Sequence, residues 1–139
     1  MTAFLSEEWF QELIALINSS SEYRAAAAEW EGDIAFHVQA EPDRGVPVDV
    51  WGYLDLWHGS CRGGGRIDGA EGARARYVIS APYTRWKDTV RGDLDPTRGM
   101  MQGRLKVRGD LATIVRQVRA ANELVRLTGE IDTEFQDES

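Results

Sequence analysis

The period of the apolar residues changes once near the start of this chain, and that change limits the folds it can adopt. Between residues 6 and 17 apolar side chains recur at spacings of three and four residues, which predicts a helix with one apolar stripe. An S-x-x-E capping box at residues 19–22 predicts a second, alanine-rich helix over about residues 20–29. The stretch DIAFHVQA, residues 33–40, then alternates with period two, which predicts a β-strand. The chain therefore contains both types of element.

Four further segments complete a predicted sheet. Residues 48–59, 75–80 and 104–108 read as strands, and the first of these carries large residues on both faces. Residues 59–72 hold six glycines, too many for an ordinary strand interior. That segment predicts a hairpin with a short, irregular edge strand, which brings the total to five strands.

Two more helices are predicted after the glycine-rich segment. Residues 82–92 form a short one, with Trp86 and Val90 four residues apart. Asp110 is predicted to cap a single long helix that ends at Gly129. The apolar stripe of this helix includes Leu111 and Val118. The predicted class is α+β, a five-stranded sheet with helices gathered on one face.

Length and charge suggest one domain with an appended tail. The 139 residues fit a single domain, assigned to residues 1–128, followed by an acidic tail at residues 129–139 that is expected to fray. Residues 1–60 hold 2 basic and 11 acidic residues, whereas residues 61–128 hold 14 basic and 7 acidic ones. The net charge of −7 argues against nucleic acid as a partner. The basic part could meet anionic groups, but neutralisation across the fold is the simpler interpretation.

No signal for membrane insertion or secretion is present in the sequence. No apolar run is long enough for a spanning helix, and the first residues lack the basic start of a signal peptide. The single cysteine, Cys61, fits a reducing compartment, so a cytoplasmic location is expected.

Catalytic and metal-binding patterns are weak. His58 and Cys61 lie three residues apart, and Asp55 could orient the histidine, which leaves a small enzyme acting on a hydrophobic substrate as an alternative. His37 reads as a solvated strand histidine. The glycine run lacks the spacing of a phosphate loop, and no metal-ligand spacing occurs. We therefore predict no catalytic residues, no metal and no cofactor.

The segment GDLDPTRGMMQGRLKVRGD, residues 92–110, carries the strongest resemblance to a known family. It resembles the G-x-L-x-P-x-x-A-F/M-M-x-G-K-L-K-x-x-G-D/N segment of the sterol-carrier-protein-2 family, also called non-specific lipid-transfer proteins. YLDLWHG at residues 53–59, the following glycine-containing hairpin and the A-x-Y-x-I-x strand are similar as well. The resemblance covers about residues 23–127, and the absence of a peroxisomal Ser-Lys-Leu ending fits a free-standing prokaryotic member. Gly99 and Arg104 depart from the family pattern, and the glycine-rich loop looks longer than usual.

This resemblance implies a mixed five-stranded sheet with helices on one face that enclose an apolar tunnel for a fatty acid, acyl-CoA or sterol-like compound. Met100 and Met101 would then lie on a short helix that lines or closes the tunnel, where flexible methionines adapt to different ligands. The candidate lining residues, chosen for their inward phase, are Leu13, Ile17, Phe36, Val38, Leu54, Leu56, Tyr77, Ile79, Trp86, Met100, Met101, Leu105 and Ile114.

A ligand head group could meet three basic residues near the tunnel mouth, namely Arg85, Lys87 and Arg98. The expected partner is a lipid or acyl-chain small molecule, with no integral membrane association but with transient contact to a membrane or an enzyme. An alternative is a ligand-free interaction module that docks on an enzyme of lipid metabolism.

Overall fold

The structure, a computed structural model, describes residues 1–138 and is built on a five-stranded sheet in the order β4-β3-β2-β5-β6. β2 runs parallel to β5, whereas the other neighbours are antiparallel, so the sheet is mixed as the resemblance implied. The strands of this sheet are β2 (Ile34–Gln39), β3 (Val50–Trp57), β4 (Ser60–Ile67), β5 (Tyr77–Pro82) and β6 (Lys106–Arg108).

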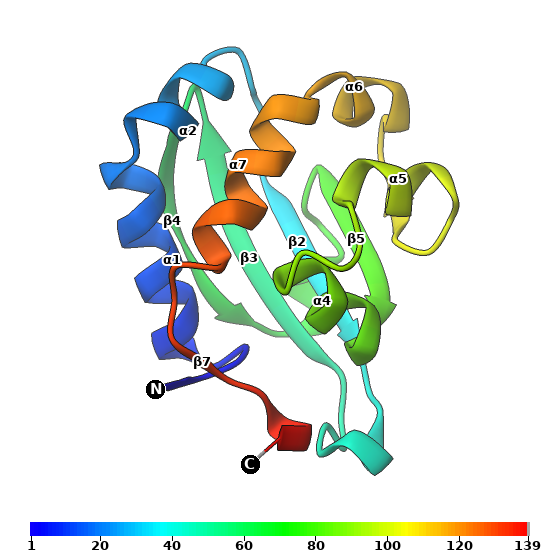
Figure 1. The fold of residues 1–139 in the computed structure, drawn as a ribbon. Coiled ribbons are helices and arrows are strands. Elements are labelled where there is room, and N and C mark those ends of the chain that lie inside the picture. The colour runs from blue at the N-terminus through cyan, green and yellow to red at the C-terminus, as the bar shows by residue number, and fades with distance from the viewer. Residues whose placement is uncertain (139) are drawn as a thin grey trace.

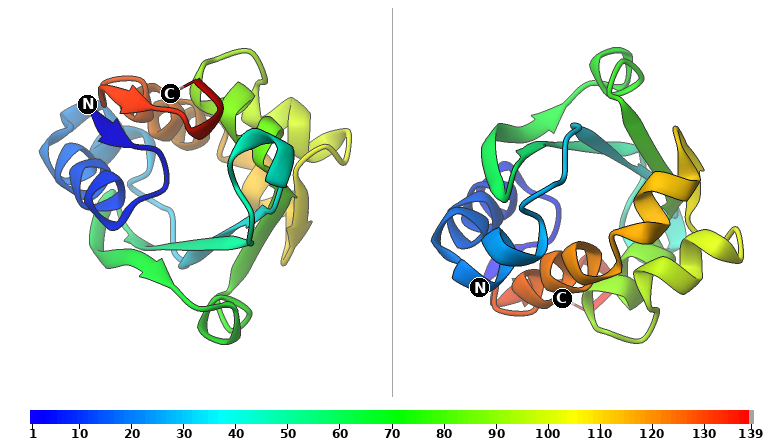
Figure 2. Two further views of the ribbon diagram at one scale, coloured as in Figure 1. Left: turned by 90° about the horizontal axis from the view of Figure 1, so that it is seen from below. Right: turned by 90° about the horizontal axis from the view of Figure 1, so that it is seen from above.

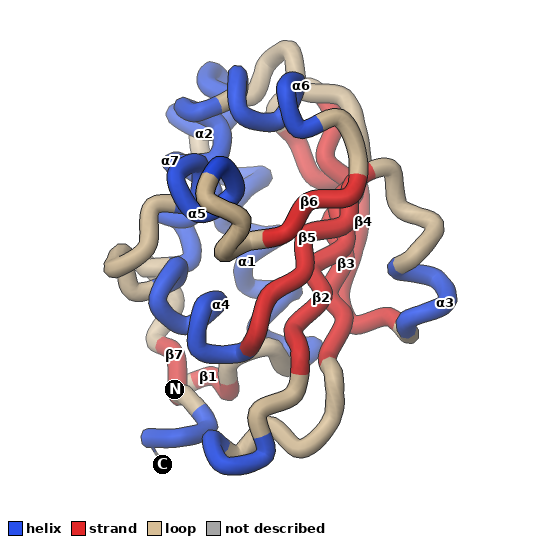
Figure 3. The backbone as a smooth tube through the Cα atoms, turned by 90° about the vertical axis from the view of Figure 1, so that its right-hand side faces the viewer, coloured by secondary structure: helices blue, strands red, loops and turns tan. Residues whose placement is uncertain are grey.

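Most helices cover one face of the sheet, as predicted (Figure 1). This layer contains α1 (Glu7–Ser19), α2 (Ser21–Ala26), α4 (Tyr83–Val90), α5 (Pro96–Met101), α6 (Leu111–Arg116) and α7 (Val118–Thr128). The short α3 (Gly69–Gly72) is an exception, because it lies on the opposite face against β2 and β3 (Figure 3). A single apolar core fills the space between the sheet and the helix layer.

α1 begins where its capping residue predicts, but the capping box at residues 19–22 puts the N-cap of α2 one residue too early, at Ser19, which is the last residue of α1. The Ser6 hydroxyl accepts a hydrogen bond from the Trp9 N–H, and the Ser20 hydroxyl accepts one from the Tyr23 N–H. The predicted apolar stripe of α1 faces the core, with Leu13 and Ile17 buried. α2 ends earlier than predicted, at Ala26.

The predicted hairpin with an irregular edge strand is confirmed, because β4 lies at the sheet edge and its pairing with β3 has a register shift between Leu54 and Leu56. The prediction that this strand is short is wrong, because β4 is eight residues long. The glycines serve close packing. A Cβ atom at Gly64 would clash with the Tyr53 carbonyl oxygen, and one at Gly65 would clash with the Glu7 carboxylate. The absence of side chains therefore lets α1 and β3 approach β4 closely.

The predicted long C-terminal helix is divided into α6 and α7 at Gln117, whose φ and ψ of −95° and 46° are not helical. The break redirects the chain, so Leu111 and Val118 are exposed instead of facing the core. The Asp110 cap lies where predicted and accepts a hydrogen bond from the Thr113 N–H.

The prediction that residues 129–139 fray is wrong for the ten described residues of that segment. Ile131 and Phe135 are buried in the core, and β7 (Thr133–Glu134) pairs in parallel with β1 (Thr2–Ala3). Figure 2 shows the two ends of the chain side by side. A final 3₁₀ turn, η2 (Gln136–Glu138), follows, and η1 (Pro42–Arg44) connects β2 to β3.

Candidate ligand cavity

Two apolar cavities lie between the sheet and the helix layer. The larger has a volume of about 90 Å³ and lies toward α5, α6 and the start of α7. The smaller, of about 70 Å³, lies toward the N-terminal segment and α1. Apolar side chains dominate both linings, so a ligand held here would leave water for a hydrocarbon-like environment.

Phe36 and Trp86 line both cavities and lie at their junction. Their rings meet edge to face, with the centroids 5.7 Å apart. The Trp86 indole N–H donates a hydrogen bond to the His37 carbonyl oxygen at 3.1 Å, which ties α4 to β2. Thr89, Leu124 and Val125 also line both cavities, so the two cavities adjoin at these five residues. The predicted continuous tunnel stays a prediction.

Few polar groups are offered to a ligand. The Thr89 hydroxyl donates to the Arg85 carbonyl oxygen at 2.7 Å, and the Thr128 hydroxyl donates to the Val125 carbonyl oxygen at 2.5 Å. These hydroxyls are occupied by their own helices. Gln117, at the break between α6 and α7, adds an amide side chain to the lining of the larger cavity. The polar end of the lining is thus the end at this break.

Most of the predicted lining residues lie on the cavity walls. Seven line the larger cavity, namely Phe36, Leu56, Ile79, Trp86, Met100, Leu105 and Ile114. The smaller is lined by Leu13, Val38 and Leu54 together with Phe36 and Trp86. Contact of these residues with a ligand stays a prediction.

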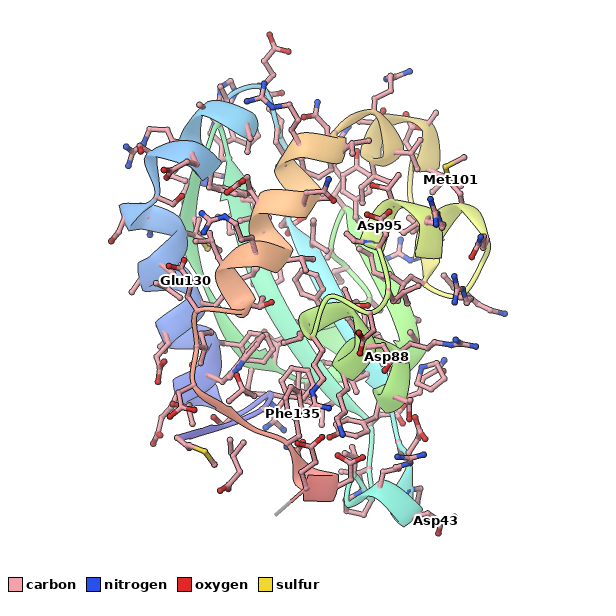
Figure 4. All side chains as sticks on the ribbon, viewed as in Figure 1. Asp43, Asp88, Asp95, Met101, Glu130 and Phe135 are labelled. Atoms are coloured by element: carbon pink, nitrogen blue, oxygen red, sulfur yellow. The ribbon has the colours of Figure 1, made fainter. Side chains whose placement is uncertain are left out.

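Three of the predicted residues lie elsewhere. Met101 is 69% exposed and points away from the cavity side of α5 (Figure 4), because successive residues of a helix are rotated by about 100° and Met100 already faces inward. Ile17 is fully buried in the core, outside both linings. Tyr77 packs on Trp30 with ring centroids 5.0 Å apart and belongs to neither lining.

Several wall residues are not among those predicted from the sequence. Trp30 and Tyr23 line the larger cavity, and Phe4 and Trp9 line the smaller one. α7 contributes further walls through Ala120, Ala121, Leu124 and Val125. The α7 residues had a usable signal, because the apolar stripe of the last helix includes Ala121 and Val125. For Phe4 and Trp9 the sequence offers no signal beyond their hydrophobicity.

Lys87 is not available to a ligand head group. It is buried and forms ion pairs with Asp137 at 2.8 Å and Glu138 at 2.6 Å. Burial alone would lower its pKa, but the hydrogen bonds to the two carboxylates outweigh that effect and raise the pKa. The other two head-group candidates differ, since Arg85 is half-buried and Arg98 is exposed.

The candidate catalytic group near His58 does not assemble. The His58 ring nitrogen Nε2 lies 2.5 Å from a Glu31 carboxylate oxygen, and the Asp55 carboxylate accepts two hydrogen bonds from Arg62. Cys61 is buried and its thiol donates to the Gly63 carbonyl oxygen. Burial raises the pKa of this thiol, which favours the unreactive neutral form.

His37 is held in a hydrogen-bonded chain, and the prediction of a solvated histidine is wrong. Its Nδ1 lies 3.0 Å from the Ser80 hydroxyl, and its Nε2 lies 2.7 Å from the Asp49 carboxylate. The ring also stacks on Trp51, with the centroids 4.1 Å apart. This order of groups resembles a hydrolase triad. However, Ser80 lies inside β5, whose backbone pairs with strands on both sides, so its own N–H is not free to stabilise an oxyanion.

Within residues 1–138, no group of three or more histidine, cysteine or carboxylate side chains could hold a metal ion. No helix in the described part of the chain is long and apolar enough to cross a membrane.

Comparison with known proteins connects this architecture to one family. The family model of the SCP-2 sterol transfer family matches residues 10–121. A search of curated protein sequences finds no match. Among solved structures, a crystal structure of sterol carrier protein 2 is 36% identical, with a TM-score of 0.82, and the match covers 92% of this chain and 98% of that one.

Two further solved structures are similar. A conserved hypothetical protein of Thermus thermophilus, described as possibly a sterol carrier protein, is 36% identical, with a TM-score of 0.85 and coverage of 96% and 93% of the two chains. The apo form of sterol carrier protein 2 from Yarrowia lipolytica shares the fold at 18% identity, with a TM-score of 0.60 and coverage of 94% and 97%. The mixed sheet, the helix layer and the match over residues 10–121 show that this chain belongs to the SCP-2 sterol transfer family.

Proposed function

We propose that this protein binds and carries a lipid or acyl compound, such as a fatty acid, an acyl-CoA or a sterol-like molecule. The single observation that carries this proposal is the pair of adjoining apolar cavities between sheet and helices. The family match supports it, because the family is named for the transfer of sterols, which are lipids. Burial of hydrocarbon supplies the affinity, at about 0.8 kcal/mol for each methylene removed from water.

A bound acyl chain is expected to lie across the junction at Phe36 and Trp86. Each cavity alone is small, so a long chain would use both and displace the aromatic pair from its edge-to-face contact. The polar end of such a ligand is expected near Gln117, the amide in the lining. The hydrocarbon end would then point toward Phe4 and Leu13 in the smaller cavity.

We further propose carriage without chemical conversion of the ligand. The thiol of Cys61 and the ring of His58 are each engaged with other groups. The hydrogen-bonded chain at His37 lies on the other face of the sheet from Phe36, because neighbouring strand residues point to opposite faces.

The first experiment is native mass spectrometry of the protein purified from its expression host, followed by extraction of whatever is bound. A stoichiometric adduct with the mass of a fatty acid, phospholipid or prenyl lipid is the expected result. A clean apo mass, together with no binding of a fluorescent fatty acid, would refute carriage and leave an interaction module as the better explanation.

A cavity-filling variant tests the location. Ala121 lines the larger cavity, whereas Asn122 is its exposed neighbour on α7. Ala121→Phe should lower the affinity for the fluorescent fatty acid at least tenfold, because the ring occupies the ligand volume. Asn122→Phe should leave the affinity unchanged. Equal affinities of the two variants, both folded by circular dichroism, would place the ligand elsewhere.

A further inference from the structure

Three of the large apolar side chains exposed on this protein lie on three neighbouring helices at one end of the helix layer. Met101 ends α5 and is 69% exposed, Leu111 begins α6 and is 40% exposed, and Val118 begins α7 and is 40% exposed. α5 packs against both α6 and α7, so the three helices adjoin one another (Figures 1 and 3). Grouped exposure of this kind marks a contact surface more often than scattered single residues do.

The same helices carry a surplus of positive charge. Together α5, α6 and α7 hold four arginines, at positions 98, 116, 119 and 126, and one acidic residue, Glu123, in a chain whose net charge is −7. Arg98 precedes Met101 by three positions on α5, and Arg116 and Arg119 flank Val118. Within residues 1–138, no ion pair involves any of these three arginines. Arg126, at the other end of α7, is paired with Glu123, and Arg44, Arg62, Lys87 and Arg91 are paired with carboxylates in other parts of the chain.

This surface also adjoins the polar end of the larger cavity. Met100 of α5, Ile114 of α6 and Ala120 of α7 face the cavity, while Met101, Leu111 and Val118 on the same helices face outward. Gln117 lies between α6 and α7 at the break in the helix. A lipid that enters or leaves the larger cavity between these helices would cross this surface.

Other surfaces do not combine the two properties. α1 carries Glu7, Glu8 and Glu12 and no basic residue, so an anionic surface would repel it. Exposed Val48 lies next to Asp49 in the acidic first part of the chain. Exposed Trp57 is covered on one side by the Arg62 guanidinium, which is itself paired with Asp55.

We propose that the protein docks on an anionic lipid bilayer through the α5–α7 face, which we define as Met101, Leu111 and Val118 with Arg98, Arg116 and Arg119. The apolar side chains enter the head-group region, and the arginines contact lipid phosphates. This inference rests on the proposed carrier function, because docking in this orientation brings the polar end of the larger cavity to the membrane from which a lipid would be taken.

The test measures sedimentation of the purified protein with vesicles of two compositions. Vesicles of phosphatidylcholine mixed with phosphatidylglycerol should bind the protein, and vesicles of phosphatidylcholine alone should bind it at least tenfold more weakly. Binding should also fall as salt is raised, because ions screen the contact between arginines and phosphates. Equal binding to both vesicle types, or none to either, would overturn the proposal.

Variants locate the docking surface. Arg116→Gln with Arg119→Gln should weaken partition into anionic vesicles by more than tenfold, since each basic residue contributes about fivefold. Arg74→Gln with Arg76→Gln removes the same charge from the connection between α3 and β5 and serves as the matched control. Met101→Glu should also weaken vesicle binding, because it replaces an apolar side chain of the α5–α7 face with a charged one. An equal loss in the control pair would show non-specific attraction and overturn the assignment.

Binding of a fluorescent fatty acid in solution, measured on the same samples, separates this inference from the carrier function. Fatty-acid binding without vesicle binding refutes only the docking surface. Vesicle binding without binding of the fatty acid supports the surface and refutes the proposed carriage of acyl chains.

Discussion

Met100 and Met101 are neighbours in the sequence but lie in different environments. Met100 is 6% exposed and lines the larger cavity, whereas Met101 is 69% exposed. The sequence assigned both residues to the same wall, although the geometry of a helix allows only one of two adjacent side chains to face a given direction. The methionine pair thus divides its roles between the cavity and the surface.

Truncating each methionine should separate these roles. Met100→Ala should lower the free energy of unfolding by about 2 to 4 kcal/mol, because it removes buried apolar contacts, and should weaken binding of a fluorescent fatty acid. Met101→Ala should change the free energy of unfolding by less than about 0.5 kcal/mol and leave fatty-acid binding unchanged. Urea unfolding and fluorescence titration give the two quantities. Equal weakening of fatty-acid binding by both variants would contradict the placement of Met101 outside the cavity.

At the scale of the elements, the close packing of α1 on the sheet depends on glycines in the facing strands. A Cβ atom at Gly52 of β3 would collide with the Phe10 ring of α1, which is 2% exposed and cannot move into solvent. Gly65 of β4 similarly makes room for Glu7. The Glu7 carboxylate accepts a hydrogen bond from the Arg66 N–H at 2.6 Å, the leading cause of its lowered pKa. Close approach and hydrogen bonding therefore fix the position of α1 together.

Gly52→Ala should destabilise the protein by about 1 to 3 kcal/mol, because the added methyl group overpacks the contact between β3 and α1. Phe10→Leu shortens the side chain on the other side of that contact. Phe10→Leu should lower the free energy of unfolding less in the Gly52→Ala background than in the wild-type protein. A double-mutant cycle of urea unfolding measures this difference. Additive effects of the two substitutions would show that the residues do not meet.

At the scale of the whole molecule, the C-terminal segment joins the ends of the chain and secures the helix layer. Asp137 accepts hydrogen bonds from Lys87 at 2.8 Å, from the Tyr83 hydroxyl at 2.9 Å and from Arg44 at 3.2 Å. These donors come from α4 and from the turn η1 between β2 and β3. Burial alone would raise the pKa of Asp137, but the three hydrogen bonds lower it to about 2. One carboxylate thus connects three distant parts of the chain.

This lowered pKa predicts a loss of stability in acid. Because the folded-state pKa lies below the unfolded value, the contribution is complete above about pH 4 and is lost as the pH falls from about 4 to about 2. Asp137→Asn should cost about 1 to 2 kcal/mol near neutral pH and should flatten the dependence of unfolding free energy on pH in that window. Urea unfolding at a series of pH values measures both effects. An unchanged pH dependence in the variant would rule out Asp137 as its source.

Sequence patterns predict the α+β class and the caps at Ser6 and Asp110. Ten of the thirteen residues chosen for their inward phase lie on the cavity walls, and their contact with a ligand stays a prediction. These features depend on periodicity and on contacts between near neighbours, which a single sequence records. The resemblance supplied the family and the mixed sheet.

Local patterns do not predict the length of strand β4, the break at Gln117, the burial of Phe135 or the ion pairs of Lys87 with the C-terminal carboxylates. Each of these depends on a partner distant in sequence. The glycines of β4 are needed because neighbouring elements pack closely against this strand. Lys87 can be buried because carboxylates far along the chain compensate its charge. Local sequence signals therefore define the type and approximate place of most elements, whereas contacts between distant segments decide where elements end and which polar residues are buried.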